Sequence, residues 1–150
     1  MEQTIISSDS HVIEVPDLWE KGVPSSFTER APKAFFDEER DAWMFGSAEV
    51  PVQAVGGLFM AGQRPDQVES FRRAGFSVAR PGGWDPLERM KDMVTDGVAP
   101  EVLYPSLGLG LFSLEDAALQ EALFRTYNDW LIDYCQKVPD RLFGIALISM

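Results

Sequence analysis

Residues 85–105, DPLERMKDMVTDGVAPEVLYP, decide the fold, because a helix with recognisable end signals leads directly into a short apolar strand. Asp85 is a suitable helix cap, Pro86 fits the first helical position, and Glu88 can reach back to the cap. Gly97 follows as a typical C-terminal stop. The stretch therefore predicts a helix that ends at Gly97 and is followed by a strand.

The apolar residues of this helix indicate which of its faces is buried. Leu87, Met90 and Val94 recur at the spacing of one helical face, so we expect that face to pack on the core. The strand is predicted over residues 101–104 and ends at Pro105. A helix followed by a short strand is one repeat of an alternating α/β fold.

The same alternation continues on both sides of this stretch. Residues 4–7 are a short β-rich run, Ser113 and Asp116 open a longer helix with a regular apolar stripe before Pro139, and residues 142–148 form a continuous apolar run. Such a run is typical of a strand buried on both faces. We expect three parallel strands side by side in chain order with both helices on one face, in either a closed barrel or an open sheet.

An irregular segment separates the first strand from the helix that begins at Asp85. Residues 15–83 are rich in proline and glycine, which breaks regular elements into short pieces. Within it, residues 42–45 and 50–52 flank a Gly-Ser turn and predict a small hairpin with Pro51 on an edge strand. We interpret 15–83 as an insertion that caps the C-terminal ends of the strands.

Length and charge limit the class of protein. The chain has 150 residues, 45% hydrophobic and 25% charged, which is the balance of a soluble globular protein. A complete (β/α)₈ barrel needs about 250 residues, so a barrel of this length would be incomplete. Its 13 Lys and Arg against 24 Asp and Glu give a net charge of −11 without a basic cluster, which argues against nucleic acid as a partner.

The single cysteine and the N-terminal sequence bear on the compartment. Cys135 has no partner for an internal disulfide and is expected to be a small helix-face residue rather than a nucleophile. Residues 1–10 contain no long apolar run of the kind found in signal peptides or membrane spans. We therefore expect a cytoplasmic protein with no membrane partner.

A metal-binding pattern follows the first strand. Asp9 and His11 are two residues apart, so their side chains point to the same side of an extended strand. A carboxylate oxygen with an imidazole nitrogen suits zinc, with iron or manganese as alternatives. Glu14 could be a third ligand, a partner that orients the imidazole, or an acid–base group.

Other polar residues are candidates for binding substrate. Tyr104 and Ser106 end the second strand, where a hydroxyl could contact a substrate or a metal-bound water. Residues 108–110, Gly-Leu-Gly, lack the rest of a nucleotide-binding motif and are interpreted as a flexible loop. Arg80 and Arg89 could bind a substrate carboxylate, although Arg89 lies in the predicted helix, where an ordinary surface or structural charge is expected.

Several segments of the chain carry a resemblance to a known family: ISSDSHVIEVPDLW (6–19), WDPLERMKDM (84–93), Gly97-Val98, VLYPS (102–106), YNDWL (127–131) and PDRLFG (139–144). Together they resemble the amidohydrolase-related family, the group that includes aminocarboxymuconate-semialdehyde and resorcylate decarboxylases. The first segment contains Asp9 and His11 in the Asp-x-His form of that family's first-strand motif. The resemblance covers both ends of the chain and misses mainly the insertion.

The resemblance implies both a fold and a chemistry. The fold is the N-terminal portion of a (β/α)₈ TIM barrel, about three βα units, with 1–150 as part of one domain and 15–83 as its inserted cap. The implied activity is metal-dependent hydrolysis of a small organic substrate through metal-activated water. The remaining ligands, a histidine and an aspartate, would lie beyond Met150, so we expect the 150 residues alone to be inactive.

Two other functions remain open at this point. One is metal-dependent, non-oxidative decarboxylation of an aromatic or unsaturated carboxylic acid, in which the ion orients the substrate carboxylate. The other is a non-catalytic fragment or interaction module, because an exposed edge on the third strand would favour pairing with another chain. A second copy of the chain and the remainder of the barrel are the candidate protein partners.

Overall fold

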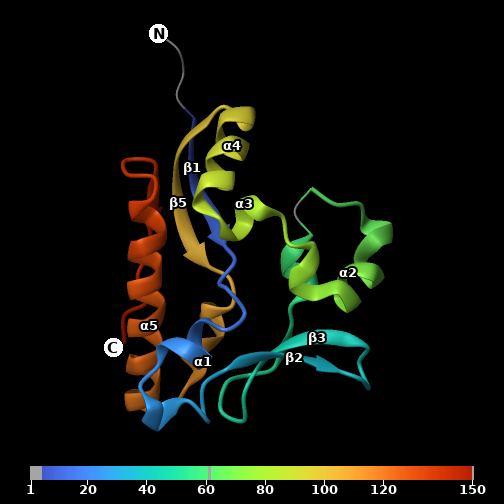
Figure 1. Cartoon of the computed structure of the whole chain (residues 1–150), viewed down its shortest axis with the longest axis vertical. Coiled ribbons are helices and arrows are strands. Elements are labelled where there is room, and N and C mark those ends of the chain that lie inside the picture. Colours follow the sequence, from blue (N-terminus) through green and yellow to red (C-terminus); the bar gives the residue numbers. More distant parts are fainter. Residues whose placement is uncertain (1–4, 61, 150) are drawn as a thin grey trace.

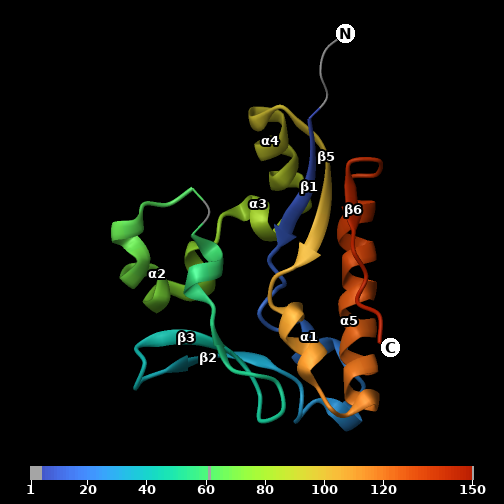
Figure 2. The same cartoon turned by 180° about the vertical axis from the view of Figure 1, so that it is seen from behind.

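A three-stranded parallel sheet forms the centre of the computed structural model, which describes residues 5–60 and 62–149. Its strands are β1 (Ile5–Val12), β5 (Val98–Pro105) and β6 (Leu142–Gly144), hydrogen-bonded in the order β1-β5-β6 (Figure 2). Both pairings are parallel, so the predicted order and direction of the three strands are confirmed. Thr4 of the first predicted strand lies outside the described residues.

The ladder between β1 and β5 shifts register twice. Between the pairs Ser7–Glu101 and Ser10–Leu103, β1 holds one residue more than β5, and the two serine hydroxyls hydrogen-bond at 2.7 Å across the extra length. Nearer the start of the ladder the extra residue lies on β5, where Pro100 has no N–H to donate. The two shifts cancel, so the strands are back in register at their carboxyl ends.

Two helices with capped N-termini connect the strands. They are α4 (Pro86–Asp96) and α5 (Ala117–Gln136), and Figures 1 and 2 show both on the same face of the sheet. Asp85 and Asp116 each accept hydrogen bonds from two backbone N–H groups of the first turn. Gly97 ends α4 at φ 68°, a conformation that glycine adopts without strain. The predicted caps at Asp85 and Asp116 and the predicted stop at Gly97 are therefore confirmed. Glu88 does not reach back to the cap as predicted, because it pairs with Lys91 and the Asp85 N–H donates to the Pro81 carbonyl.

The predicted buried face of α4 is wrong for two of its three residues. Leu87 and Val94 are 59% and 69% exposed, whereas Met90 packs partly buried against the core and Arg89 and Met93 are buried. The helix turns this face inward because the Arg89 guanidinium hydrogen-bonds groups on β1 and β5 that would otherwise lack partners. An apolar pattern alone does not predict such an orientation.

The core lies between the sheet and α5 and continues into the inserted segment. The predicted stripe of α5 is buried at Leu119, Leu123, Tyr127, Leu131 and Tyr134. Within the insertion, helix α1 (Leu18–Gly22) presents the fully buried Trp19, whose indole N–H donates to the Leu123 carbonyl at 3.1 Å. The Trp19 ring also packs on Phe45 at a centroid distance of 5.2 Å. Insertion and strands therefore share one core.

The third strand is shorter than predicted. Regular pairing ends at Gly144 instead of continuing to residue 148, and Phe143 is 50% exposed. Among the described residues β6 pairs only with β5, so it is an edge strand. Phe143 and Gly144 are exposed, so β6 is not buried on both faces as predicted. Leu147 is nevertheless held in place, because its N–H and C=O both hydrogen-bond the Asn128 side chain at 2.8 Å.

The insertion contains a second sheet and several short helices. Its antiparallel strands are β2 (Lys33–Asp37), β3 (Ala42–Gly46) and β4 (Gln53–Ala54), in the order β2-β3-β4. The predicted hairpin is present as the antiparallel β3–β4 pair, but its second strand begins at Gln53 instead of lying over residues 50–52, and β3 makes its longer pairing with β2. Besides α1, the helices are α2 (Val68–Ala74) and α3 (Pro81–Trp84), with 3-10 turns at η1 (Ser25–Phe27), η2 (Gly56–Phe59), η3 (Pro65–Gln67) and η4 (Gly75–Val78). Figure 1 shows β2 and β3 beyond the carboxyl ends of β1 and β5, with α2 to one side.

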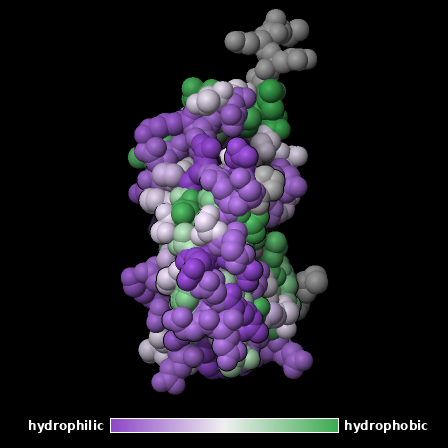
Figure 3. Space-filling view, turned by 90° about the vertical axis from the view of Figure 1, so that its right-hand side faces the viewer, coloured by the Kyte–Doolittle hydropathy of each residue, from purple (hydrophilic) through white to green (hydrophobic). Residues whose placement is uncertain are grey.

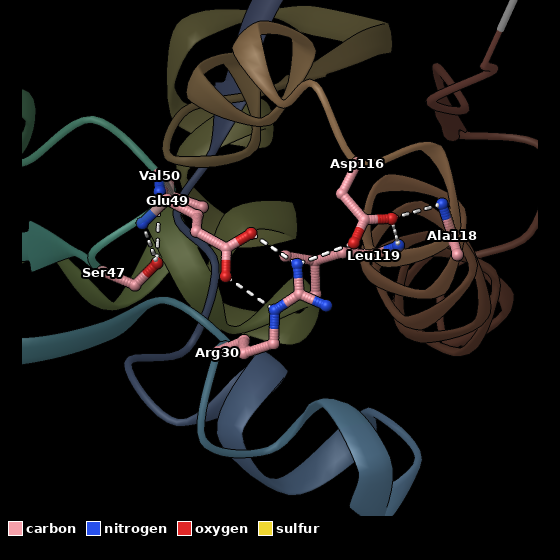
Figure 4. Close-up of polar contacts among 7 residues, drawn as sticks. All are labelled: Arg30, Ser47, Glu49, Val50, Asp116, Ala118 and Leu119. Carbon is pink, nitrogen blue, oxygen red and sulfur yellow. Dashed lines mark hydrogen bonds and ion pairs between the residues drawn. The ribbon is translucent and has the colours of Figure 1, made fainter.

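Arg30 ties the insertion to the start of α5 (Figure 4). Its Nε donates to Glu49 at 2.6 Å and its Nη2 donates to Asp116 at 2.7 Å, the same carboxylate that caps α5. The hydrogen bond from Arg30 lowers the pKa of Asp116. All three side chains are about one third exposed, so solvent screens the attraction, and the link orients the segment more than it stabilises it.

Exposed surfaces differ around the molecule. The face drawn in Figure 3 is mostly hydrophilic, with hydrophobic residues gathered along one edge. The strands themselves carry exposed apolar side chains at Ile5, Ile6 and Phe143. Within the described part of the chain, none of the helices combines the length and apolar character that a membrane crossing requires.

The cap of α4 provides a test of the fold. Asp85→Ala removes the acceptor for two N–H groups and should lower the free energy of unfolding by about 1 kcal/mol. Asp133→Ala, an exposed carboxylate within α5, is the control and should change it by less than about 0.5 kcal/mol. Urea denaturation measures both, and equal losses would show that Asp85 does not act as a cap.

Candidate active site at the end of the first strand

Asp9 and His11 lie together near the carboxyl end of β1. The Asp9 Oδ1 and His11 Nε2 atoms are 3.8 Å apart, and the side chains are 83% and 47% exposed. Both groups therefore face solvent and could bind one ion between them. Their proximity agrees with the side-chain direction expected from the two-residue spacing.

The His11 ring is fixed by its other nitrogen. Nδ1 lies 2.9 Å from the Pro105 carbonyl oxygen at the end of β5. Because a carbonyl can only accept, the Nδ1–H donates, and the neutral ring has its lone pair on Nε2. Metal-binding histidines are commonly held in this way by a carbonyl or carboxylate. The nitrogen beside Asp9 is therefore the one available to an ion.

Arg89 holds the main chain of His11. Its Nη2 donates to the His11 carbonyl at 2.5 Å, its Nε donates to the Gly82 carbonyl at 2.8 Å, and its Nη1 pairs with Glu101 at 2.8 Å. The Arg89 and Glu101 side chains are only 10% and 14% exposed. Arg89 is therefore the structural charge that the sequence predicted, but it is buried instead of lying on the surface. Its partner, Glu101, was not predicted. It could have been, because a glutamate at the start of a buried apolar strand needs a positively charged partner.

Glu14 is completely buried behind this site. Its Oε1 accepts from the Ser106 and Gly108 N–H groups at 3.1 and 2.9 Å, and its Oε2 accepts from the Leu107 N–H at 2.9 Å. Burial raises the pKa of Glu14 to about 7, against the lowering effect of these N–H donors. A Cβ at position 108 would lie 3.2 Å from Oε1, so the close approach favours glycine there.

The three predicted metal-binding side chains do not gather at one point. Asp9 and His11 are neighbours, but the Glu14 carboxylate is turned to the backbone of residues 106–108. Over the part of the chain that the structure describes, no group of three or more His, Cys, Asp or Glu side chains could hold an ion. The structure thus brings together two of the three candidates.

The predicted substrate-binding residues, Tyr104 and Ser106, lie near His11. The Tyr104 ring is 6.1 Å from the His11 ring, and Tyr104 is half-buried. Ser106 lines the same cavity as His11. Residues 108–110 are not the expected flexible loop, because they begin the 3-10 helix η5 (Gly108–Ser113) and Gly108 is buried. Contact of Tyr104 or Ser106 with a substrate stays a prediction.

A cavity of about 590 Å³ opens beside His11. Its walls come from the end of β1, from Leu58 and Phe59 of the insertion, and from residues of α3 and α4. Arg80 lines it too, with its guanidinium 2.9 Å from the Asp92 carboxylate. The insertion therefore forms one wall of the space next to His11.

Comparisons with known proteins support the fold. No family model and no curated protein matches the chain. Among solved structures, the chain is similar to an amidohydrolase from Mycobacterium avium subsp. paratuberculosis K-10, with a TM-score of 0.68 and 18% identity. The match covers 99% of this chain and 43% of that chain, so the chain spans less than half the length of that amidohydrolase. The likeness in fold is consistent with part of a TIM barrel.

The buried pair of Arg89 and Glu101 yields a stability prediction. Arg89→Ala leaves the Glu101 carboxylate buried without its cation and should lower the free energy of unfolding by about 3 kcal/mol. Arg125→Ala breaks the exposed pair with Glu121, whose side chains are 72% and 64% exposed, and should cost less than about 1 kcal/mol. Chemical denaturation compares the two, and similar losses would contradict the role assigned to Arg89.

Glu14 yields a prediction of pH dependence. Its pKa of about 7 in the folded protein exceeds the ordinary value of 4.5, so between these pH values the folded state holds more protons than the unfolded state. The stability of the wild type relative to Glu14→Gln should therefore fall as pH rises through this window, by about 3 kcal/mol in total.

Urea unfolding from pH 4.5 to 8 measures this difference. Glu115→Gln removes an exposed carboxylate and is the matched control, whose stability should stay parallel to that of the wild type. If the Glu14→Gln curve also stayed parallel, burial would not raise the pKa of Glu14.

Proposed function

We propose that the chain carries part of an amidohydrolase-type barrel that performs metal-dependent hydrolysis of a small organic substrate, with Asp9 and His11 as ligands of a divalent ion. The observation that carries this proposal is the 3.8 Å separation of Asp9 Oδ1 and His11 Nε2, with His11 Nδ1 already bonded to the Pro105 carbonyl. The fold likeness to a solved amidohydrolase supports it.

The chemistry of the two side chains fits a divalent transition metal. A carboxylate oxygen and an imidazole nitrogen suit zinc, iron(II) or manganese, and both side chains are exposed enough to be reached by an ion. Their place at the carboxyl end of a parallel strand is where the active sites of barrel enzymes lie. A divalent ion held there would polarise a carbonyl-type bond and lower the pKa of a coordinated water.

The other residues of the site have supporting roles. The Pro105 carbonyl keeps the proton of a neutral His11 on Nδ1, so that Nε2 can act as a ligand. Arg89 holds the His11 main chain, which keeps the ring close to Asp9. The cavity beside His11 would accept the substrate, and Ser106 in its wall offers a hydroxyl.

Two protein ligands make an incomplete catalytic site. Catalytic zinc usually takes three protein ligands and keeps one position open. We propose that the further ligands come from the remainder of the barrel, in line with the greater length of the matched amidohydrolase. Metal affinity of these 150 residues should therefore be weak, and hydrolysis requires the complete barrel.

Zinc binding tests the proposed ligands. Isothermal titration of the chain with zinc chloride should detect one weak site, and Asp9→Ala or His11→Ala should lower its affinity at least about tenfold, as expected for losing a contact to the metal. Asp129→Ala removes an exposed carboxylate on α5 and should leave the affinity unchanged. Unchanged affinity in His11→Ala would remove His11 from the site and overturn the proposal.

A further inference from the structure

We propose that Glu14 is a positioning residue, which sets the tautomer and orientation of His11 through the peptide group that joins Pro105 to Ser106. The inference rests on the proposed function, because His11 matters as a candidate metal ligand. The positioning itself can be measured without any metal, so the two ideas can fail separately.

One peptide group lies between the two side chains. Its carbonyl, from Pro105, accepts the His11 Nδ1–H at 2.9 Å, and its N–H, from Ser106, donates to Glu14 Oε1 at 3.1 Å. A peptide group is planar, so fixing the direction of its N–H also fixes the direction of its C=O. The Glu14 carboxylate therefore aims the carbonyl that receives the His11 proton.

Electronic effects act in the same direction as the geometry. A carboxylate that accepts from a peptide N–H polarises the group, and in a chain of hydrogen bonds this makes the carbonyl at the other end a better acceptor. The stronger acceptor favours the proton on Nδ1 and leaves Nε2 as the free nitrogen beside Asp9. Glu14 thus supports the tautomer that a metal ligand requires.

The turn has little freedom to relax around Glu14. The carboxylate also accepts the N–H groups of Leu107 and Gly108, so three consecutive amides after β5 point at one side chain. Leu107 and Gly108 are buried, as is Glu14, and removing the carboxylate would leave their N–H groups without this acceptor and away from water. Loss of Glu14 should therefore reorient the turn and its Pro105 carbonyl.

The same contacts argue against the other roles open to Glu14. Both of its oxygens are occupied by backbone donors, and the carboxylate belongs to no cluster of metal-binding side chains among the described residues. Glu14 is fully buried and does not belong to the lining of the cavity beside His11, where a substrate would react. A role through another residue is the one that fits.

The experiment uses the fact that His11 is the only histidine of the chain. In ¹⁵N-labelled, metal-free protein at pH 8, two-bond ¹H–¹⁵N correlation spectra show which imidazole nitrogen carries the proton, with no ambiguity of assignment. The wild type should show the Nδ1–H tautomer. Glu14→Gln should shift the population toward Nε2–H and lower zinc affinity about tenfold.

Two controls separate positioning from a loss of stability. Asp85→Ala weakens the cap of α4 without touching residues 105–108, so it should keep the Nδ1–H tautomer while lowering stability. Glu115→Gln, an exposed carboxylate, should change neither quantity. A role of Glu14 in stability alone would make Glu14→Gln behave like Asp85→Ala.

A second variant keeps the proposal testable if Glu14→Gln does not fold. Glu14→Asp keeps the carboxylate but shortens the side chain by one methylene, so it cannot accept all three N–H groups of residues 106–108 in the same way and should shift the tautomer in the same direction and by less. If the variant that folds still shows the Nδ1–H tautomer, unchanged from the wild type, the proposal is overturned. If Glu14→Gln loses zinc binding but keeps the tautomer of the wild type, Glu14 acts as a metal ligand instead. If the tautomer depends on Glu14 but the wild type does not bind zinc, only the proposed function is refuted.

Discussion

The parallel ladder between β1 and β5 is the constraint on which the rest of the structure depends. It joins strands separated in sequence by the whole insertion and α4, and it aligns the carboxyl ends of both strands at the pair His11–Tyr104. Every contact described around His11 follows from that alignment, including the Pro105 carbonyl on its ring and the Glu14 carboxylate against the next turn. The insertion can therefore vary in form as long as it returns the chain to this register.

Buried polar groups, rather than apolar contacts alone, hold the strand ends in place. Arg89 reaches from α4 to a carbonyl on β1 and a carboxylate on β5, and Glu14 satisfies three amides of the following turn. Such networks stabilise only when every member has a partner, and they disfavour alternative arrangements that leave a charge buried alone. Here both networks reach the backbone around His11, so buried polar groups adjoin the exposed side chains of Asp9 and His11.

Much of the fold could be predicted because its signals are local. Asp85 and Asp116 mark the starts of helices, Gly97 marks an end, and the apolar stripe from Leu119 to Tyr134 lies where its spacing indicates. The predictions failed where contacts between residues distant in sequence determine the structure. Arg89 turns inward because it hydrogen-bonds Glu101 and the His11 carbonyl. The strand predicted over residues 142–148 ends at Gly144. At the site, spacing predicted that Asp9 and His11 would be neighbours, but no local pattern shows that Glu14 faces the backbone of residues 106–108.

The paired register shifts of the β1–β5 ladder preserve the side to which the site residues point. Side chains on a strand alternate with a period of two, so a single uncompensated shift would exchange the faces of all the residues beyond it. Here the two shifts lie between the pairs Ile5–Val98 and Ser10–Leu103 and cancel, so the pairs before and after them keep the same phase. The irregular pairing around Pro100 on β5 therefore leaves unchanged the side of β1 on which His11 lies.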